Sequence, residues 1–151
     1  MINLTNNFID NHELFEINNL INLIDFPWFI IKQNPCLELH HEVHKSLIGP
    51  TILKSFIEKL EINKVNKAVL KRICQTNKLQ NCDNTIIYNY NKPSKNAVFF
   101  LNTNDGLTKY GLNNSVESVE NCLLLFDVNE PFYQTSCTNK TSRLILEINY
   151  E

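Results

Sequence analysis

The sequence has 151 residues, of which 43% are hydrophobic and 20% are charged, and a formal net charge of −2. This length is typical of one domain with a real core. No apolar run is long enough to span a membrane, and the weak negative charge gives no electrostatic reason to bind nucleic acid. We therefore expect the protein to bind neither a membrane nor nucleic acid. No basic segment precedes an apolar one, and we expect a soluble, unexported, cytoplasmic protein.

The first third of the chain predicts two helices and a strand. Residues 7–24 have helical spacing interrupted by asparagines, which indicates a short helix and a connector. Residues 25–31 contain Pro27 within an aromatic and β-branched run, which favours a strand with Trp28 as a packing anchor. Residues 51–60 have the clearest helical spacing, and Thr51 or Ser46 could cap that helix.

Between these elements lie three of the chain's four histidines, His40, His41 and His44, with Glu38 and Glu42 among them. On a helix His40 and His44 could both reach one metal ion, whereas on a strand His40, Glu42 and His44 would share a face. The zincin pattern HExxH is one residue short here. The simpler interpretation is that these histidines make ordinary hydrogen bonds.

The second half of the chain is typical of an antiparallel β protein. Residues 97–101, 122–126 and 144–150 are apolar and β-rich, and polar turn residues separate them. Residues 85–90 alternate like a strand. Residues 68–79 could be a helix by propensity alone, but we favour a strand.

The five cysteines, an odd number, form no CxxC pair, so the sequence suggests neither a disulfide framework nor a zinc ribbon. We expect them to be reduced and mostly buried. Asparagine is abundant while only three glycines are present, and we expect some asparagines to take left-handed turn positions. Heavy use of Asn, Ile and Lys is expected of an A/T-rich genome.

Several stretches resemble the 2-oxoglutarate/Fe(II)-dependent oxygenases, particularly compact ones from phages and marine microbes. They are FPWFI at 26–30, FFLNTNDGLT at 99–108, LLFD at 124–127 and TSCTNKTSR at 135–143. The resemblance implies an α+β, mainly β fold: a double-stranded β-helix (jelly-roll, cupin-like) with N-terminal helices packed on one sheet. It also implies a single domain over 1–151, divided into an N-terminal part at 1–66 and a barrel core at 67–151.

The same resemblance locates the positions of the family's site. The family holds iron with two histidines and one carboxylate, and an arginine binds the distal carboxylate of 2-oxoglutarate. The iron ligands would fall at Tyr88, Tyr90 and Phe132, or after a slip of one residue at Asn89, Asn91 and Tyr133. Arg143 matches the arginine. No histidine follows His44 in the chain, so no alignment can supply the usual ligands.

We therefore predict a degenerate member of this family whose barrel interior is filled by aromatic side chains. Arg143 would either pair with an acid such as Asp127 or Glu130, or remain as part of a dicarboxylate pocket. Asp83 and Asp105 are further nearby carboxylates. Asp105 and Asp127 are better explained as turn and strand-end residues that bond neighbouring backbone N–H groups. Cys137 has no nearby histidine to activate it, and we expect a buried or turn thiol.

The predicted function is a catalytically inactive binding or structural module without a cofactor, with a role in viral assembly or host interaction. Its partner would be another protein or a second copy, recruited through an edge strand. The alternative is an active dioxygenase that uses Fe(II) and 2-oxoglutarate with non-standard ligands, or with iron held through His40, His41 and His44.

Overall fold

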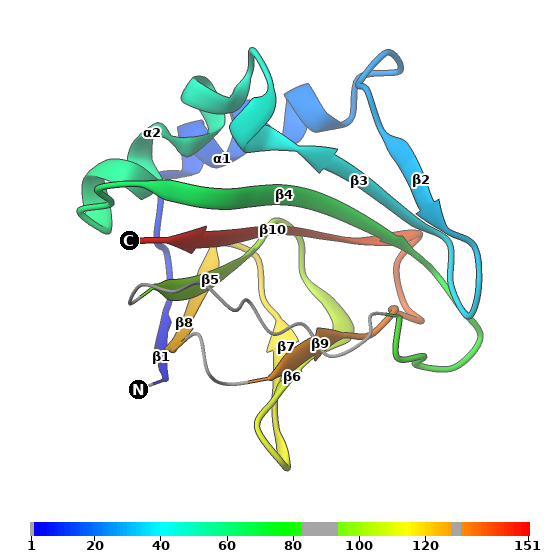
Figure 1. Cartoon of the computed structure of the whole chain (residues 1–151). Coiled ribbons are helices and arrows are strands. Elements are labelled where there is room, and N and C mark those ends of the chain that lie inside the picture. The colour runs from blue at the N-terminus through cyan, green and yellow to red at the C-terminus, as the bar shows by residue number, and fades with distance from the viewer. Residues whose placement is uncertain (1, 83–93, 128–130) are drawn as a thin grey trace.

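Two antiparallel β-sheets face each other in the computed structural model, which describes residues 2–82, 94–127 and 131–151 (Figure 1). The larger sheet contains β1 (Asn3–Thr5), β2 (Phe29–Lys32), β3 (Glu38–Glu42), β4 (Val65–Cys74), β5 (Lys95–Phe100), β8 (Cys122–Asp127) and β10 (Ser142–Tyr150). The smaller sheet contains β6 (Asn104–Tyr110), β7 (Asn114–Ser118) and β9 (Phe132–Gln134). Their strand orders are β1-β8-β5-β10-β4-β3-β2 and β7-β6-β9.

The chain alternates between the two sheets along its second half. After β4 in the larger sheet, Asn81 forms a bridge with Thr135 next to the smaller sheet, and the chain then returns to the larger sheet at β5. It continues through β6 and β7 in the smaller sheet, β8 in the larger, β9 in the smaller and β10 in the larger. This alternation is that of a jelly roll, so the predicted double-stranded β-helix is confirmed.

Two helices cover the outer face of the larger sheet (Figure 1). In α1 (Asn11–Ile21) the buried residues recur at helical spacing, and the Asp10 side chain caps the helix by accepting a 2.8 Å bond from the Glu13 N–H. The second helix, α2 (Gly49–Lys59), buries Ile52, Leu53 and Phe56. The predicted helices and their packing on one sheet are thus found.

The predicted cap of α2 is wrong. Its N-cap is Ile48, which makes no side-chain capping bond, and Pro50 stands in the first turn, where its missing N–H costs little. The Ser46 hydroxyl instead donates to the Val43 carbonyl oxygen, 3.0 Å away, because the preceding 3₁₀ turn η1 (Val43–Lys45) needs its own carbonyl satisfied.

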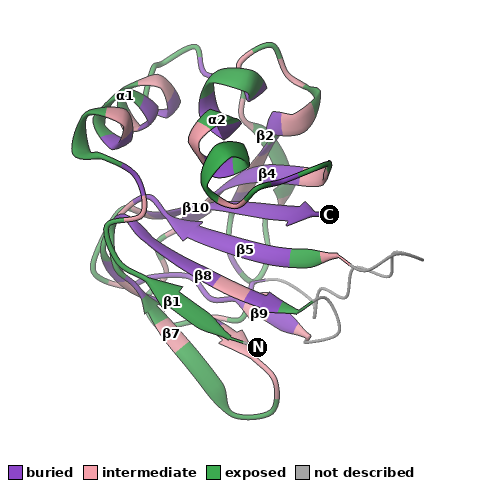
Figure 2. Ribbon diagram, turned by 90° about the vertical axis from the view of Figure 1, so that its left-hand side faces the viewer, coloured by how far each residue is buried: buried purple, intermediate pink, exposed green. Residues whose placement is uncertain are grey.

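The two layers create two apolar clusters. The first lies between the helices and the larger sheet, where the rings of Phe8, Phe56 and Phe99 pack with centroids 5.0–6.3 Å apart. The second lies between the sheets and includes Phe100 and Phe126. Because β5 and β10 are covered on both sides, almost every residue in them is buried (Figure 2).

Other predicted elements meet different outcomes. The strand favoured over a helix at residues 68–79 is present as β4. Trp28 is a packing anchor, with its ring 4.9 Å from that of Phe26 and its indole N–H donating to the Ile21 carbonyl oxygen. The strand predicted at residues 85–90 lies outside the described residues. No helix in the described ranges is long and apolar enough to cross a bilayer.

The prediction that all cysteines are reduced is wrong. Cys36, in the β2–β3 turn, forms a disulfide with Cys82, which follows β4. The sequence hides this pair because 46 positions separate the two residues, and only the fold brings their Cα atoms to 5.8 Å. Cys74, Cys122 and Cys137 are free thiols, and the last two are buried as expected.

Candidate functional site

Three charged side chains meet inside the barrel. Lys71 of β4 and Glu147 of β10 form an ion pair, with 2.9 Å between Nζ and Oε2. The Lys71 Nζ also lies 4.0 Å from Oε1 of Glu38 in β3. Each of the three is exposed by 3% or less. Charges so deeply buried are tolerated only when they are paired, so this cluster must form together with the barrel.

Hydrogen bonds extend this cluster to the smaller sheet. The Gln134 side-chain amide of β9 donates to Glu147 Oε1 over 2.9 Å. The Thr108 hydroxyl of β6 donates to the Gln134 oxygen over 2.7 Å. A continuous polar path therefore crosses the barrel interior and joins the two sheets. We call Glu38, Lys71, Glu147, Gln134 and Thr108 the interior polar network.

Arg143 stands at the far end of this network, at the start of β10, and is fully buried. Its guanidinium donates hydrogen bonds of 2.7–3.1 Å through all three nitrogens, to oxygen atoms of Ser118, Thr108, Leu107 and Thr135. Gly106 packs against its side chain so closely that an added Cβ would lie 2.5 Å from Arg143 Cδ. Arg143 thus ties β10 to the smaller sheet.

Of the predicted iron-ligand positions, Phe132 and, after the slip of one residue, Tyr133 lie in the described part of the chain. Tyr88 and Tyr90, and the alternatives Asn89 and Asn91, lie outside it. Phe132 in β9 is buried, and its ring packs edge-on against Phe126 with centroids 4.6 Å apart. At this position the barrel interior therefore holds aromatic bulk, as expected.

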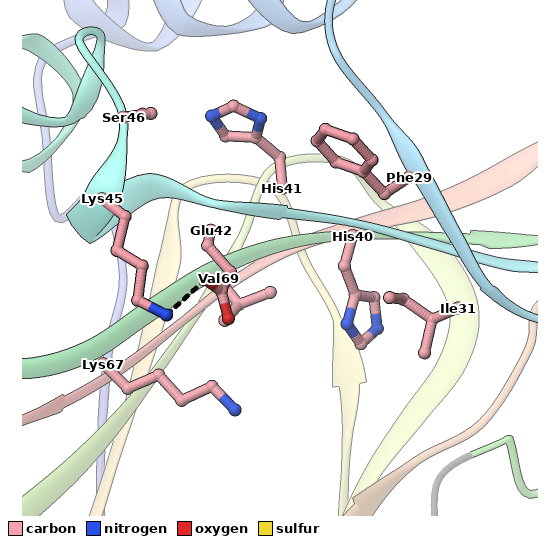
Figure 3. Close-up of a pocket in the computed structure, with 9 residues that line it drawn as sticks. All are labelled: Phe29, Ile31, His40, His41, Glu42, Lys45, Ser46, Lys67 and Val69. Atoms are coloured by element: carbon pink, nitrogen blue, oxygen red, sulfur yellow. Dashed lines mark ion pairs between the residues drawn. The ribbon is translucent and has the colours of Figure 1, made fainter.

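The three neighbouring histidines do not converge on one point. The rings of His40 and His41 point to opposite sides of β3 (Figure 3). His40 Nε2 lies 2.6 Å from Glu38 Oε1, whereas His41 Nδ1 lies 3.0 Å from the Pro27 carbonyl oxygen. His44 Nδ1 is placed near the backbone of Ala68. Within the described ranges no three His, Cys, Asp or Glu residues are grouped so that they could hold a metal ion.

The carboxylates considered above as metal ligands or as partners of Arg143 are Asp83, Asp105, Asp127 and Glu130. Asp105 was expected to bond its sequence neighbours, but it accepts hydrogen bonds from the backbone N–H groups of Thr138 and Asn139 and from the Thr138 hydroxyl. Burial alone would raise the pKa of Asp105, but these bonds outweigh it and lower the pKa. Asp127 is exposed at the strand end, opposite Lys95. Asp83 and Glu130 lie outside the described residues.

Cys137 is a buried thiol, as expected. Its sulfur donates to the Lys140 carbonyl oxygen over 3.3 Å, and burial raises the pKa of the thiol. A raised pKa keeps the sulfur protonated and unreactive at neutral pH, which does not suit a nucleophile.

A pocket of about 430 Å³ opens beside the interior polar network, at the edge formed by β2, β3 and η1 (Figure 3). Apolar side chains from β2 and β4 and charged side chains from β3, β4 and η1 line it together. Its lining residues are Phe29, Ile31, His40, His41, Glu42, Lys45, Ser46, Lys67 and Val69.

Solved structures with the same arrangement share little sequence with this chain. A prolyl-4-hydroxylase from Pseudomonas putida matches with a TM-score of 0.63 and 11% identity, over 99% of this chain and 91% of the other. HygX from Streptomyces hygroscopicus, with nickel and 2-oxoglutarate bound, matches with a TM-score of 0.66 and 10% identity, over 99% and 82%. The chain has the 2-oxoglutarate/Fe(II) oxygenase fold.

A third match carries a peptide. It is a prolyl hydroxylase from Trichoplax adhaerens in complex with a peptide fragment of the hypoxia-inducible factor oxygen degradation domain. The TM-score is 0.67 and the identity 13%, over 99% of this chain and 82% of the other. No family model and no curated protein matches the sequence.

The described interior of this oxygenase fold does not fit a two-histidine, one-carboxylate iron centre. Such a centre needs imidazole ligands inside the barrel. Phe132, at a position predicted for one of these ligands, is instead packed in an apolar cluster. The ammonium group of Lys71 would also oppose a cation placed beside Glu147. A dicarboxylate fits poorly at Arg143, because protein oxygen atoms already face all three of its nitrogens.

Sequence reasoning missed most of the interior polar network. One signal was available: Lys71 alternates with the apolar residues Val69 and Ile73, and Glu147 follows Ile145 at the same spacing, so alternation places each charge on an apolar side of its strand. Nothing in the sequence alone pairs them, because they become neighbours only through the registry of β4 with β10.

Proposed function

We propose that this chain is an oxygenase-fold protein that binds a ligand or partner and does not activate oxygen. The observation that carries the proposal is the barrel interior, where Lys71 places an ammonium group beside Glu147 and where Arg143 is already hydrogen-bonded to protein oxygen atoms. The absence of any histidine after His44 supports it. A role in viral assembly or host interaction, and a cytoplasmic location, remain predictions from composition and resemblance.

The test compares this protein with an active oxygenase of the same fold. Both are purified without oxygen, incubated with Fe(II), desalted and analysed for bound iron, and then supplied with 2-oxoglutarate and oxygen. We expect the Pseudomonas putida prolyl-4-hydroxylase with a proline-containing substrate to release succinate, and this chain to hold well under one iron and release none above the protein-free blank.

One iron per chain together with succinate release would contradict the proposal and establish the alternative, an active dioxygenase with non-standard ligands. A thermal-shift titration with 2-oxoglutarate adds an independent reading, because a ligand that binds only the native state raises the melting temperature. We expect no shift at millimolar 2-oxoglutarate, since Arg143 is already bonded to the protein.

A further inference from the structure

A second pocket, of about 370 Å³, lies on the helix-covered face of the larger sheet. It is formed by the end of α1, the connector from α1 to β2, strand β3 and the turn before α2. We call it the connector pocket. It shares His41 and Ser46 with the pocket of Figure 3. A hollow of this volume suits a compact molecule.

Apolar side chains make up most of the wall of the connector pocket. Leu20, Phe26 and Ile48 extend the core cluster that lies beneath the helices. Leu23 and Leu47 also line the pocket, and they are exposed by 54% and 102%. Covering these two side chains with the apolar part of a ligand would be favourable, because it removes apolar surface from water.

In the described part of the chain, nothing donates a hydrogen bond to one ring nitrogen of His41. The residue is only 6% exposed, and its Nδ1 lies 3.0 Å from the Pro27 carbonyl oxygen. Because that oxygen can only accept, Nδ1 carries the proton, and the neutral ring has its lone pair on Nε2. Nε2 is buried and has no hydrogen-bond partner among the described residues. A buried acceptor without a donor costs free energy, which an N–H or O–H group of a ligand would offset.

The other polar side chains of the connector pocket are acceptors as well. His41 and Ser46 lie on the same side of β3 in Figure 3. The Ser46 hydroxyl already donates to the Val43 carbonyl oxygen, so its lone pairs are left to accept. Among the described residues that line the pocket, Asp25 carries the only full charge, and no ion pair joins it to another described residue. Three acceptor groups, one of them negatively charged, complement a cation that donates several hydrogen bonds.

We propose that the connector pocket binds a small primary amine with an apolar tail. The ammonium group donates to His41 Nε2 and Ser46 Oγ and faces the carboxylate of Asp25, while the tail covers Leu23 and Leu47. The proposal rests on the binding function proposed above and names a ligand class for it. A carboxylate ligand would meet only acceptors, and a neutral alcohol would gain nothing from the charge of Asp25, so the chemistry of the pocket favours the amine.

The probe is 2-phenylethylamine, titrated by calorimetry at low ionic strength and at a mildly alkaline pH that keeps imidazole groups neutral. The control ligand is 2-phenylethanol, which has a hydroxyl in place of the ammonium group. We expect a Kd of about 1 mM or tighter for the amine. The alcohol should bind about tenfold more weakly, because a neutral hydroxyl makes weaker hydrogen bonds than an ammonium group. Equal affinity for amine and alcohol, or no binding of the amine, would overturn the proposal.

Three variants locate the site. His41→Asn removes Nε2 but can keep the bond to the Pro27 carbonyl oxygen, because its amide nitrogen takes the place of Nδ1, and it should weaken amine binding about tenfold. Asp25→Asn should weaken binding of the amine and leave the affinity for the alcohol unchanged. Glu58→Gln, at an exposed acid on α2, is the matched control and should bind the amine as the wild type does.

The proposal fails if either His41→Asn or Asp25→Asn binds the amine as tightly as the wild type does. Thermal melts of each variant separate a loss of binding from a loss of fold. Because Asp25 is exposed, its variant tests the site even where the substitution of the buried His41 destabilises the protein.

These results are independent of the iron and succinate assay, because the connector pocket lies outside the barrel. Amine binding without succinate release supports both proposals, and amine binding with succinate release refutes only the non-catalytic one. A protein that neither binds the amine nor releases succinate would refute the ligand class and leave the non-catalytic function standing.

Discussion

Lys71 carries its charge into a strand whose neighbouring inward-facing residues, Val69 and Ile73, are apolar. Burying an ammonium group costs several kcal/mol unless carboxylates compensate it. Glu147 at 2.9 Å and Glu38 at 4.0 Å provide that compensation. The interior polar network therefore specifies the register in which β3, β4 and β10 pair, because a slip of one residue would turn these charged side chains to the opposite face of the sheet.

We predict that Lys71→Met lowers the free energy of unfolding by about 3–5 kcal/mol, because it leaves two buried carboxylates without their shared cation. The double variant Lys71→Met/Glu147→Met should be more stable than the single one, since it removes a charge of each sign. Urea unfolding followed by circular dichroism measures both. A loss no greater than that of the exposed control Lys54→Met would contradict the role given to the pair.

The β2–β3 hairpin is held to the rest of the molecule by a covalent bond as well as by strand pairing. It extends the larger sheet beyond β4, and the Cys36–Cys82 disulfide fastens its turn to the segment after that strand. Disulfides are rare in cytosolic proteins, so this bond counts against the predicted cytoplasmic location. Because residues of β2 and β3 also line the pocket of Figure 3, the disulfide fastens the element that forms this pocket.

We predict that Cys36→Ser destabilises the oxidised protein by up to about 4 kcal/mol, the loop-closure entropy of a crosslink spanning this separation. Unfolding in denaturant with and without a reducing agent measures it, and Cys74→Ser, a free cysteine, is the control. Thiol titration of the unfolded, unreduced protein should count the three free cysteines. A count of all five cysteines would show that the disulfide does not form.

Taken whole, the molecule has a large sheet that ends in two edges, β1 and β2. The β1 edge is short, whereas β2 presents Phe29, Ile30 and Ile31, each more than half exposed. Exposed apolar edges favour pairing with another strand. The expected homo-oligomer or protein contact would therefore use β2.

We predict that the protein self-associates at high micromolar concentration and that Ile30→Lys shifts it towards the monomer, because a charge on the edge opposes strand pairing. Sedimentation velocity over a concentration series measures this. Leu4→Lys, at the other edge and also exposed, is the matched control and should leave association unchanged. A wild-type protein that stays monomeric throughout would show that no second copy uses this edge.

Much of the fold could be predicted from local residue patterns. The helix at 51–60 follows from spacing, because Ile52, Leu53 and Phe56 must share one face. Turn residues were also predictable in kind: Asn7 and Asn121 have positive φ angles of 51° and 62°. The Asn121 side chain additionally bonds both backbone groups of Ile9, which no local pattern reveals, because 112 positions separate the two residues.

The sequence by itself determined that this chain forms an antiparallel β protein and that no histidine lies after His44, since both follow from residue types and their order. Only the tertiary structure decided that Lys71 meets Glu147, that Cys36 meets Cys82, and that the pocket forms beside β3. The physical reason is registry: which distant residues become neighbours depends on how strands pair across the sheets, and that pairing is a property of the whole folded chain.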